Sequence, residues 1–532
     1  MKKFLSMLLT LVLTAALFAV PAMAEGKTII AAIEGDPQQM DPTLNSYSRS
    51  SKVLQNLFKG LYKLDADGAT YVPAMAESCE VSEDGLTYTF TLRDGLKWSD
   101  GSDLTAYDFE YSWLRVLDPE IGSKCVSDLW LIENAQAYYN GECAVEDVGI
   151  KAEDEKTFVV RLNAPTPWFL SLIATSSFLP VSKANVEANP NWTSDVATYV
   201  SNGPFMLKEY SSLNRLVLVK NPYYYMADDV KIDEVDFVII EDATTELTAY
   251  NNGEINIGFL SNTISSDGLI QYKDSDEFHE QGKIGIQYCD FNTQLPEFSD
   301  SRVRRAFAMA IDRQAMLDAL GVIEKPVYGF VPYAQPSLTD SSKSYRDVAG
   351  DMFTEDVAAA QALMAEAGYP NGEGFPAVEL VVKNDTQQKL MAQILGEFWK
   401  ANLGVNYTIT TYESSVYWGE LDAGHFSVDR NGYTCDFVDP SANLKIFVTG
   451  SNAYENGWDD ETYDQLYADA MSKTDAAERE AGLIAAEQYL TEQMPAMPVY
   501  SFEMFYLVKP GFTGVVCNAI GHMFFEYADI AA

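Results

Sequence analysis

Residues 378–411 read VELVVKNDTQQKLMAQILGEFWKANLGVNYTITT and carry the clearest fold signal in the chain. Val378–Val382 is a short run of mostly apolar, β-branched residues, which is typical of a strand. Gln387–Asn402 follows with the apolar spacing of a helix, and Val405–Thr411 returns to strand character. A strand, a helix and a second strand in this order predict an α/β unit.

The segments before this unit favour helix. A helix is predicted over Val357–Ala367, with Gly368 as its end. Ser301–Leu320 places its apolar residues on one stripe and is predicted as a single helix. Asp300 is the expected N-cap of that helix and Gly321 its stop signal.

The first half of the chain adds strands between Gly- and Asp-rich turns. Strands are predicted over Leu86–Leu92, Arg215–Val219 and Val235–Ile240, and a short helix over Thr244–Asn251, ended by Gly253. Helices and strands therefore alternate along most of the chain, which predicts α/β lobes. Because no fixed-period repeat and no low-complexity linker occurs, we expect ordered crossing strands to join the lobes.

Size and charge bound the function. A chain of 532 residues exceeds what one hydrophobic core usually organises, so two or three domains are expected. A formal net charge of -42 argues against nucleic acid as a partner, because a phosphate backbone would be repelled over most of the surface. Solubility is the simplest interpretation of this charge.

The amino terminus has the pattern of a secretory signal peptide. Two lysines follow Met1, an apolar stretch runs from Phe4 to Val20, and small residues lead to Ala24 before Glu25. A membrane anchor is the alternative, but the apolar stretch is short of the ~20 residues that a span requires. We therefore expect residues 1–24 to be cleaved. No lipobox cysteine lies at the expected cleavage site, so a periplasmic or extracellular protein without a lipid anchor is expected.

Few residues point to chemistry. The six cysteines are widely scattered and form no Cys-x-x-Cys pair: Cys79, Cys125, Cys143, Cys289, Cys435 and Cys517. The three histidines, His279, His425 and His522, form no His-x-x-x-His pair. No metal site and no cofactor are therefore expected. No nucleophile elbow, phosphate loop or dinucleotide fingerprint is present. The many carboxylates leave a secreted glycoside hydrolase open as an alternative.

Many short motifs, in one order from about residue 30 to the carboxyl end, carry a family resemblance. They are Asp41-Pro42, residues 53–61 (VLQNLFKGL), 74–78 (AMAES), 82–90 (SEDGLTYTF), 93–101 (RDGLKWSDG), 105–109 (TAYDF), 201–205 (SNGPF), 221–225 (NPYYY), 303–307 (VRRAF), 310–313 (AIDR), 430–437 (RNGYTCDF) and 507–510 (LVKP). With these motifs the chain resembles the extracytoplasmic oligopeptide-binding proteins, which are the family 5 solute-binding proteins of ABC importers.

The resemblance implies a two-lobed α/β fold, periplasmic-binding-protein-like of type II, with a ligand cleft between the lobes. Lobe I would comprise residues 25–58, 200–288 and 505–532, with an extra subdomain over 59–199, and lobe II would comprise 289–504. The family binds without turnover, so a monomeric, non-enzymatic receptor is expected. It would capture short peptides and deliver them to the permease subunits of an ABC transporter at the membrane.

The resemblance also implies ligand-binding residues in lobe II. Asp436 aligns with the family aspartate that pairs with the free amino group of the peptide. An ammonium group enclosed between the lobes loses its water and needs a fixed anionic partner. Arg430 matches an arginine that meets the carboxylate of short peptides. An ordinary loop aspartate and a structural ion pair are the respective alternatives.

The remaining contacts follow from the same alignment. Backbone pairing and one pocket wall are expected from Gly432, Tyr433, Thr434 and Cys435. On the facing lobe, the ligand would pair with Asn45, Ser46 and Tyr47. Core packing of Tyr433 and a solvent turn at residues 45–47 are the alternatives.

Several positions depart from the pattern of the family. Tyr433 and Ser414 stand where relatives often carry tryptophan, and Cys125 stands where an aromatic residue often faces the ligand; these changes enlarge or polarise the pockets. Gln388 stands where some relatives have a histidine near the peptide carboxylate, so a length preference does not carry over. Cys289 aligns close to Cys435 at the cleft, and a disulfide between them is a hypothesis.

Other ligands remain open at this level. Members of the family with the same fold bind oligosaccharides, nickel chelates or haem, and the aspartate at position 436 favours a peptide over these. A secreted carboxylate hydrolase is a further alternative that no motif supports.

Overall fold

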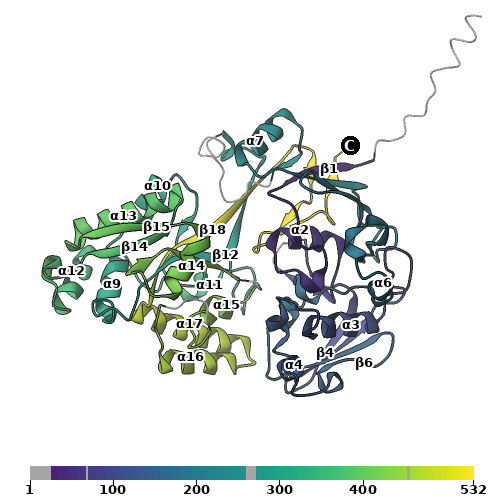
Figure 1. Ribbon diagram of the computed structural model, residues 1–532, viewed down its shortest axis with the longest axis horizontal. Helices are drawn as coiled ribbons and strands as arrows, with labels where there is room; N and C mark the ends of the chain where they lie inside the picture. Colours follow the sequence, from purple (N-terminus) through teal and green to yellow (C-terminus); the bar gives the residue numbers. More distant parts are fainter. Residues whose placement is uncertain (1–25, 67–69, 259–270, 436, 452–455, 532) are drawn as a thin grey trace, which may run out of the picture.

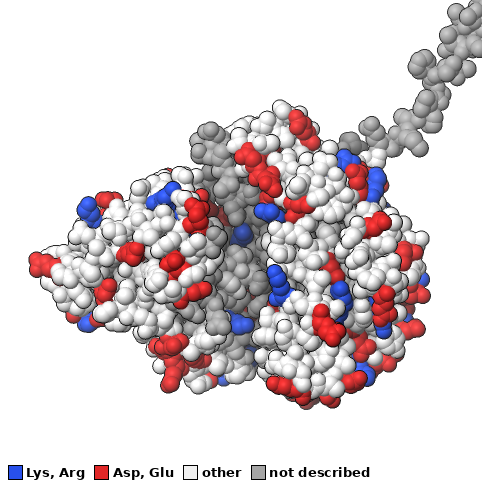
Figure 2. All heavy atoms as spheres, in the orientation of Figure 1, with Lys and Arg blue, Asp and Glu red and all other residues white. Residues whose placement is uncertain are grey.

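The computed structural model describes residues 26–66, 70–258, 271–435, 437–451 and 456–531. It has two halves (Figure 1), and the molecular surface is hollowed between them (Figure 2). Two long strands, β12 (Phe278–Asp290) and β18 (Ala496–Val508), run from one half to the other and pair antiparallel along most of their length. The prediction that ordered crossing strands join the lobes is thus confirmed.

These two strands belong to a nine-stranded sheet that extends into both halves. Its order is β17-β12-β18-β11-β1-β10-β9-β8, with β13 paired to β18. The bounds are β1 Thr28–Ile33, β8 Phe205–Ser211, β9 Arg215–Lys220, β10 Glu234–Ile239, β11 Ile257–Gly258, β13 Lys325–Pro326 and β17 Asn431–Thr434. β1 and β10 are parallel, whereas β8, β9 and β10 form an antiparallel meander. The strands predicted around residues 215 and 235 are confirmed.

A second, four-stranded sheet with the order β4-β5-β7-β6 lies in the same half as β1. Its strands are β4 Ala76–Val81, β5 Thr87–Leu92, β6 Ile150–Ala152 and β7 Thr157–Arg161. Helix α3 (Ala106–Leu117) packs on it, with Trp113 edge-on to Phe158 at a centroid distance of 5.1 Å. The same buried cluster continues to Val53 of helix α2 (Ser48–Leu57), so one core anchors this sheet to the rest of its half.

The other half contains the α/β unit predicted first. Strand β14 (Val378–Lys383) is parallel to β15 (Tyr407–Tyr412) and to β16 (Val428–Asp429), and helix α13 (Thr386–Leu403) connects the first two. Asp385 caps α13 by accepting a hydrogen bond from its first turn. The strand–helix–strand prediction is confirmed.

Further helices surround these sheets. In the half with β1 they are α4 Ala135–Tyr139, α5 Phe169–Leu172, α6 Lys183–Ala188 and α7 Ala243–Asn252. In the half with β14 they are α9 Ser301–Met309, α10 Arg313–Leu320, α11 Tyr345–Ala349, α12 Val357–Glu366, α14 Ser414–Asp422, α15 Pro440–Lys445, α16 Glu461–Met471 and α17 Ala476–Gln493. Helices α7 and α12 match their predicted ranges to within about one residue, within the usual spread of boundaries.

The prediction of one helix over residues 301–320 was wrong. The chain forms α9 and α10 with a break between them, because Asp312 adopts an extended backbone and accepts a hydrogen bond from the amide of Ala315. Asp312 is therefore the N-cap of a second helix. The expected Asp300 cap and the Gly321 stop, at a φ of 67°, are confirmed.

Candidate ligand-binding cleft

The groove between the halves has a cavity on the side of the half that contains β1. The cavity has a volume of about 350 Å³, and four predicted ligand-binding residues line it: Asn45, Ser46, Tyr47 and Cys125. Asn45 is buried, donates to Ser51 Oγ at 2.8 Å and accepts from the amide of Tyr47 at 3.0 Å. Its side chain thus fixes the loop that presents Ser46 and Tyr47.

Sequence reasoning missed the other residues that line the cavity. They come from α2, from β2 (Tyr62–Leu64) and β3 (Tyr71–Pro73), from the segments at 124–128 and 172–177, and from the carboxyl-terminal segment: Ser48, Ser51, Gln55, Leu64, Tyr71, Lys124, Asp128, Leu172, Ala174, Thr175, Ser176, Ser177, Asn518, Ile520, His522 and Phe524. Lys124 and Asp128 flank Cys125 and could have been found as its neighbours. The residues after 517 return from the far end of the chain, and no local motif indicates them.

The predicted backbone-pairing residues form a strand at the edge of the large sheet. Gly432, Tyr433 and Thr434 lie in β17, which pairs with residues 285–288 of β12 and is the terminal strand of the sheet. The amide of Cys435 donates to Ile284 O at 2.9 Å and extends this pairing. An edge strand is the element to which an extended peptide adds by main-chain hydrogen bonds.

Arg430 immediately precedes β17. Its Nη2 donates to the hydroxyl of Tyr500 at 3.3 Å, and its Nε is buried without an acceptor in the described residues. No carboxylate of the described residues lies within ion-pair distance of Arg430, so the structural ion pair that was its alternative is not formed there. The guanidinium group retains donor capacity at the start of the edge strand.

Of the three remaining predicted residues, the structure describes the side chain of Gln388 alone. Gln388 accepts a hydrogen bond from the amide of Lys383 at 3.1 Å, so its side chain closes the loop between β14 and α13. Ser414 begins α14, but its side chain is not among those described. Asp436, the predicted partner of the peptide amino group, lies outside the described residues.

The hypothesis of a disulfide between Cys289 and Cys435 was wrong. Cys289 is a buried free thiol, and burial raises its pKa. Cys435 is hydrogen-bonded opposite Ile284, five positions along β12 from Cys289. At about 3.4 Å per strand residue the two cysteines are roughly 17 Å apart along the strand, beyond the ~7 Å between Cα atoms that a disulfide spans.

A pair of buried carboxyl groups supports the start of β17. Asp290 accepts hydrogen bonds from Asn431 and Asn456, each at 3.1 Å, while its amide donates to Asp429 Oδ1 at 2.9 Å. Burial raises the pKa of Asp290 to about 7, and burial together with the charge of Asp290 raises the pKa of Asp429 well above its usual value. These residues hold the edge strand in place from behind.

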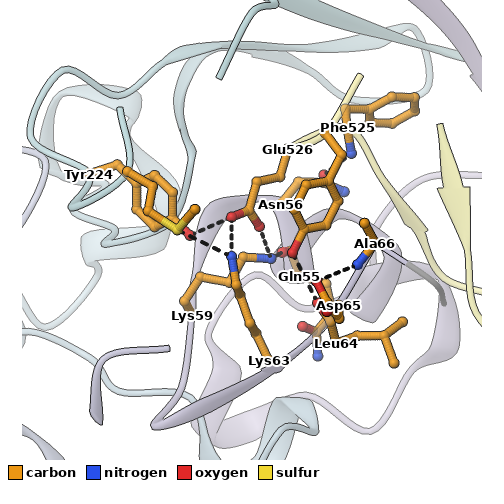
Figure 3. Close-up of polar contacts among 12 residues, drawn as sticks. Gln55, Asn56, Lys59, Lys63, Leu64, Asp65, Ala66, Tyr224, Phe525 and Glu526 are labelled. Atoms are coloured by element: carbon orange, nitrogen blue, oxygen red, sulfur yellow. Dashed lines mark hydrogen bonds and ion pairs between the residues drawn. The ribbon is translucent and has the colours of Figure 1, made fainter. Parts of the chain in front are cut away.

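A buried ion network joins the segment after α2 to the carboxyl-terminal segment of the chain (Figure 3). Glu526 accepts from Tyr224 at 2.8 Å, pairs closely with Lys63 and lies 3.4 Å from Lys59 Nζ. Lys59 also donates to the carbonyl of Gln55 at 2.9 Å, and Gln55 lines the cavity. The carboxyl-terminal segment is thereby fixed to the loop after α2.

The halves also touch through Trp168, which precedes α5. Its ring stacks on Phe437 of the other half at a centroid distance of 6.4 Å, and the guanidinium carbon of Arg479 lies 4.7 Å from the ring. Arg479 is itself held by Asp439, whose Oδ2 accepts from Nη1 at 2.9 Å. Phe437 follows Asp436 directly, so this contact borders the predicted amino-group site.

The described residues offer neither a metal site nor a membrane-spanning helix. No group of three or more His, Cys, Asp or Glu side chains there is arranged to hold a metal ion. None of the described helices combines the length and the apolar character that a membrane crossing requires.

Two α/β lobes joined by crossing strands, with a polar cavity and an edge strand at the groove, define a solute-binding protein of the periplasmic-binding-protein type. The model of the family "Bacterial extracellular solute-binding proteins, family 5 Middle" matches residues 70–455. The chain belongs to family 5 of the bacterial extracellular solute-binding proteins. The resemblance drawn from the sequence and the expected fold class are confirmed.

Individual relatives agree with this assignment over nearly their whole length. The dipeptide-binding protein DppE of Bacillus subtilis is 31% identical over 500 residues, which cover 93% of this chain and 90% of the relative. The oligopeptide-binding protein OppA of the same organism is 31% identical over 515 residues, which cover 95% and 93%. The unliganded open form of the periplasmic murein tripeptide-binding protein MppA matches with a TM-score of 0.81 and 30% identity, covering 95% of this chain and 98% of that one.

Proposed function

We propose that this chain is an extracytoplasmic receptor that captures short peptides and delivers them to the permease of an ABC transporter. The observation that carries the proposal is the edge strand β17, which starts after Arg430 in a chain whose full-length relatives are named for dipeptides and oligopeptides. An edge strand reads a peptide backbone and is indifferent to most side chains, which suits such ligands.

Binding would proceed by closure of the two lobes over the peptide. The peptide backbone adds to β17, its amino group meets Asp436, its carboxylate meets Arg430, and the loop at Asn45–Tyr47 closes from the other lobe. Its side chains enter the polar cavity, where water can fill the remaining space. The match to an unliganded open form supports the open state as the starting point of this motion.

The proposed receptor binds without turnover and acts as a monomer. Residues 1–24 are a cleaved signal peptide without a lipobox cysteine. The lobe boundaries lie near residues 58, 199, 288 and 504; the last two fall within β12 and β18, the strands that join the halves. No observation on the described residues favours an oligosaccharide, a nickel chelate or haem as the ligand, and none favours hydrolysis as the activity.

The proposal is tested with the chain from residue 25 onward, purified from the exported fraction. Protein stripped of ligand should release or absorb heat, and change its tryptophan fluorescence, on titration with mixed tripeptides to pentapeptides. Mass spectrometry of the ligand released from unstripped protein should give peptide masses. Silence across the whole mixture, or release of a sugar or haem, would contradict the proposal.

A further inference from the structure

The charge of the cleft is opposite to that of the protein as a whole. The chain has 36 Lys and Arg against 78 Asp and Glu, and Asp and Glu occupy much of the outer surface (Figure 2). Lys and Arg side chains nevertheless border the groove between the halves (Figure 2). In a protein of this charge, cations gathered at the ligand cleft require an explanation.

Four cations, one lining the cavity and three in or next to β12, β14 and β17, have no carboxylate within 4 Å in the described residues: Lys124, Lys283, Lys383 and Arg430. The fully buried cations of the same chain behave differently. Arg304 donates to backbone carbonyls. The other five are paired with carboxylates: Lys59 and Lys63 with Glu526, Arg313 with Glu355, Arg346 with Glu487 and Arg479 with Asp439. The fully buried cations are thus satisfied within the protein, whereas these four have no carboxylate partner among the described residues.

Two of the four cations share one wall of the lobe that contains β14. The amide of Arg430 donates to Val381 O at 3.3 Å, which ties it to β14, and Lys383 is the last residue of that strand. Lys383 Nζ lies 4.3 Å from the ring centre of Trp418. Burial and the charge of Arg430 lower the pKa of Lys383. Two partly desolvated cations side by side form a site for an anion.

The other two lie at the floor and on the opposite side of the groove. Lys283 precedes Ile284, the residue bonded to Cys435, and its Nζ lies 5.9 Å from the ring centre of Phe502. Burial, together with the charge of Lys52, lowers the pKa of Lys283. Lys124 lines the cavity with its Nζ 5.8 Å from the ring centre of Tyr47. An enclosed ligand would therefore meet cations from both lobes.

Acidic residues near the groove do not balance these charges. Glu34 is paired with Lys52 at 2.6 Å, and Asp128 accepts from Ser177 at 2.6 Å. Glu324 lies within electrostatic range of Lys283 and Arg430 but outside ion-pair distance, and burial raises its pKa. Among the described residues, Asp128 and Glu324 have no cation partner within 4 Å, and neither have Asp290 and Asp429 behind β17. Burial raises the pKa of all four carboxyl groups and so disfavours their charged forms. The described part of the cleft therefore keeps an excess of positive charge.

We infer that the preferred ligands are acidic peptides, whose Asp or Glu side chains meet Lys383, Lys283 and Lys124 while the terminal carboxylate meets Arg430. The inference rests on the proposed function and narrows it to a substrate class. Closure of the lobes removes water from these cations, and a carboxylate of the ligand then supplies the counter-charge that the protein does not. The same positive field attracts an anionic peptide into the groove.

Calorimetry with two peptides of equal size tests the inference. Ala-Glu-Glu-Ala is expected to bind at least about tenfold tighter than Ala-Gln-Gln-Ala at low salt, since hydrogen bonds to charged groups are the stronger ones. The ratio should shrink at high salt as the cleft charges are screened. Equal affinities would overturn the inference and leave the proposed function standing, whereas failure of both peptides to bind would contradict the proposed function itself.

A matched pair of variants assigns the effect to the cleft. Lys383→Met should lower the affinity for the glutamate peptide about fivefold or more and leave the glutamine peptide unchanged, because only a charged ligand group loses its partner. Lys400→Met removes the same charge from the exposed carboxyl-terminal turn of α13 and should change neither affinity. Equal losses for both peptides in Lys383→Met, or equal effects of both variants, would count against the inference.

Discussion

Replacing Asp436 by asparagine is expected to weaken binding of a tripeptide with a free amino group by at least about 100-fold. The substitution keeps the size of the side chain and removes its charge, so that an ammonium group enclosed by the two lobes has no anionic partner. Breaking a buried ion pair in this way costs about 3 to 5 kcal/mol, which corresponds to a loss of two or more orders of magnitude in affinity. Calorimetric titration measures the change.

The control for this prediction lies in the ligand. The N-acetylated form of the same tripeptide lacks the ammonium group, so wild-type protein should bind it weakly, and Asp436→Asn should not weaken it further. Asp422→Asn, at the exposed end of α14, should leave both affinities unchanged. A variant at 436 that still binds the free tripeptide as tightly as wild type would remove Asp436 from the site.

Replacing Glu526 by glutamine is expected to lower the free energy of unfolding by about 3 to 5 kcal/mol, because two buried lysines lose their counter-charge together. Lys59 and Lys63 are only 2% and 6% exposed, and Glu526 is the carboxylate that both contact (Figure 3). Urea and thermal unfolding, followed by circular dichroism, measure the loss.

The matched variant is Lys59→Met. Burial lowers the pKa of Lys59 to about 8, which indicates that its charged form is disfavoured in the folded protein. Its removal leaves Glu526 paired with Lys63 and hydrogen-bonded to Tyr224. Lys59→Met should therefore destabilise the protein less than half as much as Glu526→Gln. An equal or larger loss would show that the network does not depend on Glu526 as its common partner.

Local patterns predicted those elements whose start or stop signals lie within a few residues of them. The predicted cap Asp300 occupies the N-cap of α9, and the predicted stop Gly253 occupies the C-cap of α7. The error at α9 and α10 has the same origin: the apolar stripe continues across the break, and Asp312 is a cap that the stripe conceals. A capping residue inside an apolar pattern is the signal that was missed.

The candidate site was predictable only where the family resemblance reached it. Asn45 to Tyr47 and Cys125 line one cavity, and Gly432 to Thr434 form an edge strand. The charge of the cleft was not predictable, because Lys124, Lys283, Lys383 and Arg430 come from separate segments and only the fold brings them to one groove. The same holds for Glu526, whose lysine partners lie more than four hundred residues earlier.

Small-angle X-ray scattering of the ligand-free protein, repeated after addition of a peptide mixture, tests the central claim most directly. A receptor that closes two lobes over a peptide should become more compact, with a smaller radius of gyration and a shorter maximum dimension. Asp436→Asn should show no such change at the same peptide concentration. An unchanged scattering curve for wild-type protein, at peptide concentrations that saturate the heat of binding, would contradict capture between the lobes.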